Sequence, residues 1–250
     1  MGIKMTNDEK YFISHTHDKC RECLNKNMLT ETGFLGLSEQ SLVLSERYDC
    51  EYQLFGGFDD AERKMLCFLP EYPIADEDYG IAVLNVRISA KAPLSHRDYL
   101  GALMSLGIKR ENIGDIIVSD GGAQIIIKEE IANFLLSNLF RAGHTSLECD
   151  LLPLSKLDIG EVKYKEFSKT VASLRVDCVV SAVFNMSRTK SCEAVTSGLV
   201  FVNGRETSKQ SIEIDKGDKI TLRHFGRVVI TDIGRITRKG RTVIFGKIYM

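Results

Sequence analysis

The 250-residue sequence lacks several features that assign proteins to broad classes. No apolar run is long enough to cross a bilayer, and the beginning, MGIKMTNDEKYF, lacks the apolar core of a secretory signal. Tryptophan is absent, and no aromatic platform for stacking single-stranded bases is visible. We therefore expect a cytoplasmic protein that contacts no membrane, and any nucleic acid it binds to be recognised by shape.

Motifs for nucleotide binding and catalysis are also missing. The sequence has no glycine-rich nucleotide loop, P-loop or HxGH-type ATP motif, and Asp120-Gly121-Gly122 is typical of a hairpin turn. The scattered histidines have no evident catalytic partner. We predict that the protein is not an enzyme and requires no cofactor.

The 7 cysteines are an odd number and lie scattered in apolar surroundings, which favours reduced thiols over a disulfide framework. His15, His17, Cys20 and Cys23 form a compact set of possible zinc ligands. However, the two cysteines fall three residues apart on a predicted amphipathic helix, and a helix cannot easily turn all four ligands onto one tetrahedral ion. We interpret them as apolar-face thiols and predict no metal site.

Charge divides the chain into two parts. Residues 161–250 contain 17 Lys and Arg against 9 Asp and Glu, a net charge of +8. Residues 1–160 contain 16 and 25, a net charge of −9, so the whole chain carries −1. A basic segment in an otherwise acidic chain indicates a polyanionic partner for that segment.

The pattern of apolar residues predicts an α+β protein of three units, 1–75, 76–160 and 161–250. In the first, a small α/β unit, we expect helices over 11–27 and 38–48, the second capped by Ser38, and strands over 50–58 and 64–69.

In the middle unit, 76–160, the alternation of predicted strands and helices is clearer. We expect strands over 79–89, 113–118, 123–128 and 145–153, and helices over 95–108 and 129–143. Ser95 caps the first of these helices and Gly107 ends it. The order β-α-β-β-α-β is the ferredoxin-like arrangement that many RRM-type domains share. Because Ile and Val occupy the strand positions that hold paired aromatics in such domains, fold analogy alone assigns the unit no RNA role.

The basic unit begins with a linker or short strand over 162–173. Helices over 174–185 and 187–198 follow, the second capped by Ser187. Asn203-Gly204 is a hairpin turn, a further strand runs over 218–227, and two strands over 226–237 and 240–250 close the chain.

The cations of this unit cluster at a helix start or beside turns. Arg188 and Lys190 lie in the first turn of a helix, where a cation is unfavourable unless an anion such as phosphate is bound there. Arg175 begins the preceding helix. The predicted RNA-binding residues are Arg175, Ser187, Arg188, Lys190, Arg205, Lys209, Arg223 and Arg227.

The segment 175–227 resembles the RNA-binding domain first described in ribosomal protein S-four, the αL motif. The matching residues, in family order, are Arg175, Asp177, Ser187, Arg188, Gly198, Val200, Val202, Asn203, Gly204, Gly217 and Asp218. Phe201 departs from the pattern, because that position can also hold Lys or Arg, and one phosphate contact is then lost.

A wider resemblance is to the bacterial YlmH family. It rests on GIKRENIGDIIV, on DGGAQIIIKEEIANFLLSNL, on RAGHTSLECD and on the S-four-type segment that ends in FGR. The resemblance implies a cytosolic RNA-binding protein with an RRM-like middle and an S-four tail. It also implies binding to the large ribosomal subunit and tRNA during ribosome-associated quality control, where stalled chains are extended by alanine without a template. A quality-control factor is a further implied partner, and we expect a monomer.

Two alternatives remain open. One is an RNA-modification enzyme of the pseudouridine synthase type, or an accessory factor of such an enzyme. S-four domains also accompany pseudouridine synthases, and Arg175-Val176-Asp177 superficially resembles the catalytic Arg-Leu-Asp-like motif of those enzymes, although here we interpret it as scaffold. The other alternative is a protein–protein adaptor in which the acidic units bind a basic protein surface.

Overall fold

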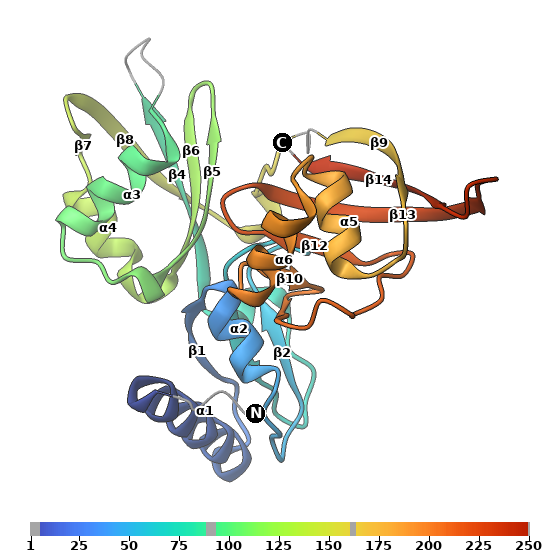
Figure 1. Cartoon of the computed structure of the whole chain (residues 1–250). Coiled ribbons are helices and arrows are strands. Elements are labelled where there is room, and N and C mark those ends of the chain that lie inside the picture. Colours follow the sequence, from blue (N-terminus) through green and yellow to red (C-terminus); the bar gives the residue numbers. More distant parts are fainter. Residues whose placement is uncertain (1–5, 89–93, 161–163, 250) are drawn as a thin grey trace. The chain divides into compact units, whose positions relative to one another are not determined.

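The computed structural model describes residues 6–88, 94–160 and 164–249 (Figure 1). The chain forms two compact units, Met1–Gly160 and Glu161–Met250. Helices, 3-10 turns included, account for 31% of the described residues and strands for 36%, so the predicted mixture of helices and strands is present.

The first unit opens with helix α1 (Asn7–Lys26), which begins before the predicted residue 11 because of a capping box. The hydroxyl of Thr6 accepts a hydrogen bond from the Glu9 N–H at 3.2 Å, and the Glu9 carboxylate accepts one from the Thr6 N–H at 2.7 Å. The buried side of α1 packs against a sheet ordered β1-β3-β2. Its strands are β1 (Thr30–Leu35), β2 (Tyr52–Phe55) and β3 (Lys64–Phe68).

Strand β1 did not follow from the sequence pattern. Gly33 interrupts its alternation, and the register with β3 shifts between Glu31 and Phe34. A Cβ on Gly33 would lie 2.6 Å from the Cβ of Glu111, so this strand needs glycine for a close approach from far along the chain. Helix α2 (Leu37–Val43) follows directly, with Gly36 as its N-cap. The predicted cap at Ser38 and the extension to residue 48 are therefore wrong.

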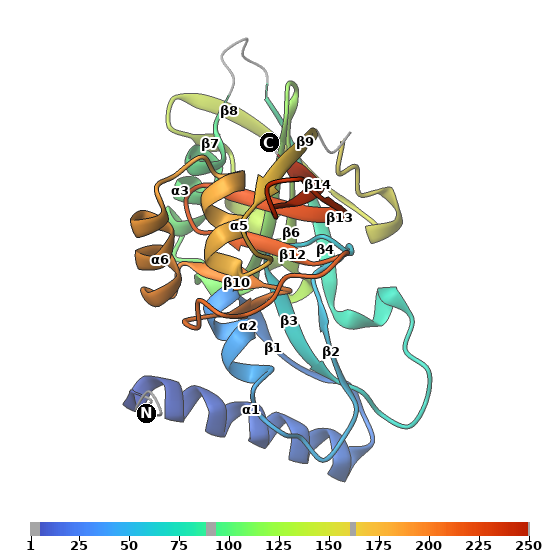
Figure 2. The same cartoon turned by 45° about the vertical axis from the view of Figure 1, so that its right-hand side comes forward.

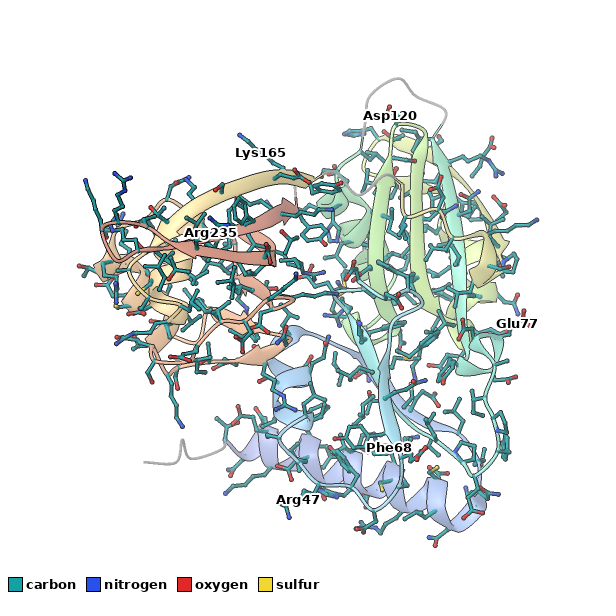
Figure 3. The ribbon with its side chains drawn as sticks, turned by 90° about the vertical axis from the view of Figure 1, so that its right-hand side faces the viewer. Arg47, Phe68, Glu77, Asp120, Lys165 and Arg235 are labelled. Carbon is teal, nitrogen blue, oxygen red and sulfur yellow. The ribbon has the colours of Figure 1, made fainter. Side chains whose placement is uncertain are left out.

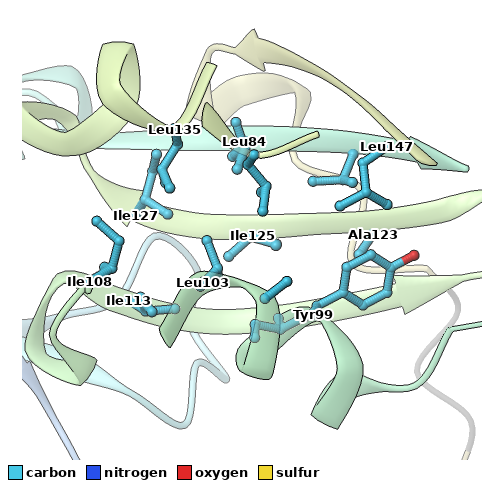
Figure 4. Close-up of a cluster of buried hydrophobic side chains, with 14 of the residues drawn as sticks. Leu84, Tyr99, Leu103, Ile108, Ile113, Ala123, Ile125, Ile127, Leu135 and Leu147 are labelled. Carbon is cyan, nitrogen blue, oxygen red and sulfur yellow. The ribbon is translucent and has the colours of Figure 1, made fainter. Parts of the chain in front are cut away.

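The rest of the unit forms a five-stranded antiparallel sheet in the order β5-β6-β4-β8-β7. Its elements are β4 (Ile81–Ile88), α3 (His96–Ser105), β5 (Ile113–Ser119), β6 (Gly122–Lys128), α4 (Ala132–Asn138), β7 (Arg141–Ala142) and β8 (Thr145–Leu152). Short 3-10 turns occupy Asp76–Tyr79, Arg110–Asn112, Glu129–Ile131 and Leu154–Lys156. The core between helices and sheet contains Tyr99, Leu103, Ile125 and Leu135 (Figure 4).

Two helix ends in this region differ in detail from the prediction. Ser95 stands at the N-cap of α3, but its hydroxyl donates to the Asp98 carboxylate instead of accepting from a helix N–H. Helix α4 stops at Asn138, because Arg141 and Ala142 pair with β8 in a hairpin whose turn contains Gly143 at φ 58°. The predicted helix over 129–143 was therefore too long.

The two sheets of the first unit share a core. Phe34, Met65 and Cys67 of the small sheet pack in one cluster with Ile81 and Ile126 of the larger sheet. Hydrogen bonds reinforce this junction, since the carboxylate of Asp115 accepts from the backbone N–H groups of Glu62 and Arg63. Residues 1–75 and 76–160 thus belong to one compact unit.

The second unit is a six-stranded sheet in the order β11-β10-β12-β13-β14-β9, with two helices on one side of it (Figure 2). The elements are β9 (Tyr164–Val171), α5 (Val176–Val183), α6 (Arg188–Thr196), β10 (Val200–Val202), β11 (Arg205–Glu206), β12 (Lys219–Leu222), β13 (Gly226–Ile236) and β14 (Thr242–Tyr249). Valines of α5 pack on Val200, Ile220 and Val228 of the sheet.

The structure decides two details of this sheet. The segment predicted as a linker or short strand is a strand over eight residues, the edge strand β9, which pairs with β14 along its whole length. Strand β12 ends at Leu222, because His224 at φ 67° and Gly226 at φ 124° turn the chain into β13. Arg223 therefore lies in the turn, and Arg227 lies in β13 instead of ending β12.

Candidate nucleic-acid interface

A buried carboxylate joins the starts of the two helices in the basic unit. The Asp177 side chain is 1% exposed and lies in the first turn of α5. Arg175, the N-cap of α5, donates to it through Nε and Nη2, each at 3.1 Å. Arg188, the first residue of α6, donates to its Oδ2 through Nε at 3.2 Å and Nη2 at 2.9 Å. Two predicted RNA-binding residues therefore share one acidic anchor.

Further contacts complete the surroundings of Asp177. Its Oδ1 accepts from the Cys178 N–H at 2.9 Å, and the Cys192 thiol lies 3.5 Å from Oδ2. The hydroxyl of the buried Ser191 donates to the backbone carbonyl of Asp177, which ties α6 to α5. The carboxylate is thus satisfied from both helices, as a buried charge requires.

The surroundings of Asp177 favour its charged, deprotonated form. Burial by itself raises the pKa of Asp177, but the hydrogen bonds and charges of Arg175 and Arg188 together lower it below its usual value. Burial works against the Arg188 cation too, yet its bond to Asp177 raises the pKa of the guanidinium. The three side chains carry a net charge of +1. Each guanidinium has five N–H donors and uses Nε and Nη2 on Asp177, so donors remain for an outside anion.

The start of α6 has the predicted cap. The hydroxyl of Ser187 accepts from the Lys190 N–H at 3.2 Å, and the Ser191 N–H donates to the Ser187 carbonyl at 3.0 Å. Asp177 offsets the unfavourable position of Arg188 at the positive end of the helix, so that placement needs no phosphate to explain it. Lys190 differs, because it is exposed and makes no ion pair within the described part of the chain.

The hairpin residues that follow are held by polar side chains. The Asn203 amide donates to Asp218 at 2.7 Å and accepts from the Lys219 N–H at 2.9 Å. Asn203 at φ 52° and Gly204 at φ 77° form the predicted turn. Arg205 and Lys209 are exposed beyond that turn.

The eight predicted residues do not form one cluster. Val202, opposite Arg205, packs in the core beneath the helices, so Arg205 lies on the helix side of the sheet edge. Arg227 alternates with the buried Val228 and therefore points to the face away from the helices. The Arg223 guanidinium also belongs to that face, lying 5.5 Å from the ring centre of Phe201.

The face away from the helices carries residues that sequence reasoning missed. Tyr164 and Tyr249 stand opposite each other on β9 and β14, and Arg227 is opposite Tyr249 on the next strand. The Nζ of Lys247 lies 3.9 Å from the ring centre of Tyr164. A short strand was one of the two expectations for residues 162–173, but Tyr164 was not singled out on it; its neighbour Lys165 extends from the surface in Figure 3.

The larger sheet of the first unit offers no comparable platform at the expected positions. On the face away from α3 and α4, Val83, Ile81 and Ile126 are buried. Next to them Asn85 and Arg87 donate to Asp150. Polar pairs and packing thus occupy the face that RRM-type domains use for bases.

The zinc-ligand set is not assembled. Cys20 and Cys23 are buried in α1, whereas His15 on the same helix is exposed. The Sγ of Cys20 lies 3.2 Å from the Sγ of Cys50. Over the ranges 6–88, 94–160 and 164–249, no group of three or more His, Cys, Asp or Glu is arranged to hold a metal ion. Within the same ranges, no helix combines the length and apolar character of a membrane span.

Known proteins resemble this chain over different shares of its length. Residues 74–156 match the family model for the RNA-binding domain assigned in YlmH. The chain is 34% identical over 238 residues to ribosome-associated protein quality control protein P2 of Bacillus subtilis (strain 168), covering 94% of this chain and 93% of that protein. The solved structure of cell division protein ylmH from Streptococcus pneumoniae matches with a TM-score of 0.52 and 19% identity, over 63% of this chain and 99% of that chain, which is a likeness of fold.

Proposed function

We propose that this chain, which belongs to the YlmH family, binds RNA of the large ribosomal subunit and peptidyl-tRNA during ribosome-associated quality control. The relative from Bacillus subtilis is named a ribosome-associated quality control protein and the matched family model describes an RNA-binding domain, so this is not an enzyme family. In this proposal the protein works in the cytoplasm as a monomer. It assists alanine tailing of stalled chains, together with a quality-control factor.

The observation that carries the proposal is the arginine pair on Asp177. Asp177 holds Arg175 and Arg188 at the starts of two helices, with donors left for phosphate oxygens. A guanidinium already held in place by Asp177 loses less conformational entropy on binding than a mobile one, which favours its contact with the phosphate backbone of RNA. Lys190 and the first N–H groups of α6 add positive potential at the same place. We propose that this helix side grips folded RNA by its phosphates.

The same segment supports an S-four-type domain over 161–250. Of the signature residues, Asn203 and Asp218 are joined by a hydrogen bond, and Arg175, Asp177 and Arg188 form one ionic group. Through these contacts, the signature residues of the S-four-type segment hold two helices and a hairpin in position. Arg205 and Lys209 extend the helix side in this proposal, whereas Arg223 and Arg227 serve the other face of the sheet.

For residues 76–160 we propose a ferredoxin-like, RRM-like module, with 1–75 as an N-terminal segment packed on it. The elements run β4, α3, β5, β6, α4, β8, and the strands lie in the order β5-β6-β4-β8. The family description assigns RNA binding to this region of YlmH, although fold analogy alone suggested no such role here. Any RNA contact of this module would then avoid the occupied face around Val83.

Ribosome co-sedimentation tests the helix-side contact. The double variant R188A/K190A should lose association with the large subunit, and the log–log salt dependence of RNA binding should become shallower by roughly one to two. The matched control is R238A/K239A, which removes the same charge from exposed positions of the same unit. If both variants bind equally with folded spectra, the assignment to α6 is wrong. A flat salt response in the wild-type protein would instead favour the adaptor alternative.

A further inference from the structure

The face of the second sheet that points away from α5 and α6 carries a band of aromatic and cationic side chains. Across adjacent strands, Thr221, Arg227, Tyr249 and Tyr164 stand in one register row. The neighbouring row on the same face pairs Val229 with Lys247. Because neighbouring strands lie about 4.8 Å apart, these side chains form a continuous surface.

The orientation of this band follows from strand alternation. Ile220, Val228 and Ile248 are in the core beneath the helices or pack against it. Their neighbours along the strands therefore point the other way. Phe245, two residues before Lys247 on β14, extends the band with a ring that is 40% exposed. Tyr164 is 46% exposed, so its aromatic surface is accessible.

We propose that this face, the aromatic face, binds unpaired nucleotides of RNA. Aromatic rings on a sheet stack with bases of any sequence, and nearby cations bind the linking phosphates. Lys247 already rests over Tyr164 at 3.9 Å, so one face of the ring is in contact with a cation. A base that takes this place releases the flexible lysine toward a phosphate, while Arg227 lies beside Tyr249 for the next one.

Charge complementarity supports an anionic occupant such as RNA over a neutral or cationic one. The unit has a net charge of +8. Arg223, Arg227 and Lys247 lie on this face. Among the described residues, Glu166 stands opposite Lys247 and Asp232 opposite Phe245, and Asp232 is bonded to Lys216. Arg227 and Lys247 thus stand beside the two tyrosines with the Glu166 carboxylate between them and the edge of the sheet.

The aromatic face is a second site, separate from the helix side. The helix side offers guanidiniums and helix N–H groups and reads phosphates of folded RNA, whereas the aromatic face offers rings and reads exposed bases. A protein with both can hold a structured element and an adjoining single strand at once. Either contact can fail without the other.

Binding of two RNA probes to the full chain tests the proposal. The probes are a single-stranded oligouridine of about ten nucleotides and a blunt RNA duplex of similar length, followed by fluorescence anisotropy. The variant Y164L/Y249L should weaken binding of the single strand about tenfold or more and leave the duplex affinity within about twofold. Y164F/Y249F, which keeps both rings, should bind like the wild type. Y11L/Y72L, which removes two exposed tyrosines of the first unit, is the matched control.

The outcomes separate this proposal from the helix-side contact. Loss of duplex binding only in R188A/K190A and loss of single-strand binding only in Y164L/Y249L would support both. Wild-type single-strand affinity in Y164L/Y249L, or a lowered unfolding temperature without an RNA defect, overturns the aromatic face and assigns these rings to protein packing. For a variant that does not fold, crosslinking of 4-thiouridine RNA to the wild-type chain decides, since crosslinks must map to peptides with Tyr164 or Tyr249.

Discussion

Replacing Asp177 by asparagine tests how the basic unit holds its arginines. The wild-type carboxylate is almost fully buried and accepts hydrogen bonds from Arg175, Arg188 and the Cys178 N–H. Asparagine keeps the shape of the side chain but loses its charge. Its NH₂ group then faces at least one guanidinium, donor against donor. D177N therefore changes the ionic group without creating a cavity.

The magnitude follows from burial. Removing one partner of a buried ion pair costs about 3–5 kcal/mol, and a hydrogen bond to a charged group contributes about 1.5–3 kcal/mol. Here the side chains of Arg175 and Arg188 are 41% and 51% exposed, so water restores part of their solvation. We expect D177N to lower the free energy of unfolding by about 2–3 kcal/mol. For a unit of this size the midpoint falls by roughly 10–20 °C.

The RNA affinity of D177N distinguishes two effects of the substitution, the altered position of the arginines and the altered charge of the protein. D177N makes the protein more positive, and Coulomb attraction alone would strengthen RNA binding. We expect weaker binding at a temperature where the variant is folded, because Arg175 and Arg188 lose their fixed positions. The control E193Q removes one negative charge from an exposed position on α6 and should neither destabilise the fold nor weaken binding.

Circular dichroism melts and fluorescence anisotropy with an RNA duplex provide the two measurements. If D177N unfolds at the same temperature as the wild type, the ionic group of Arg175, Asp177 and Arg188 does not stabilise the fold as we expect. A D177N protein that binds RNA as tightly as E193Q refutes the claim that Asp177 positions the arginines for RNA.

Three further predictions concern acid, glycine and thiols. Because the pKa of Asp177 is lowered in the fold, its stabilisation is complete above about pH 4 and is lost as pH falls further; urea melts of D177N should show less of this acid loss than wild type. G198A should destabilise by about 1–2 kcal/mol, since Gly198 has φ 69° and its new Cβ would lie 2.5 Å from the Glu206 carboxylate, which must move. G240A meets similar backbone strain at φ 71° but has open space around it, so it should cost less, and equal urea midpoints would contradict the difference. Oxidation with diamide should join Cys20 and Cys50, whose sulfurs are 3.2 Å apart, and the disulfide should stabilise the fold by about 3–4 kcal/mol. The reaction should be slow, because burial raises the pKa of the Cys50 thiol. An unfolding temperature of the oxidised protein that does not change when dithiothreitol is added would refute this prediction.

Features set by neighbouring residues could be predicted from the chain. The Ser187 cap depends on a hydrogen bond to Lys190 three residues on, and the Asn203-Gly204 turn depends on two backbone conformations. Both were found because their causes are local. Strand β1 was not, since Gly33 is required by Glu111, far along the sequence.

Among the proposed RNA-binding residues too, some features could be predicted from nearby residues and others depended on residues far along the chain. Composition and motif spacing indicated a basic RNA-binding segment and named Arg175 and Arg188, but not that both would hold Asp177. Pairing β9 with β14 brought Tyr164 opposite Tyr249, residues that no local pattern connects. The sequence by itself determined the Ser187 cap, the Asn203-Gly204 turn, the charge and the family of this protein, because these depend on residues within a few positions of one another or on matching in order. Only the tertiary structure decided which cations share a carboxylate and which side chains share a face of the sheet, because strand pairing and burial join distant parts of the chain.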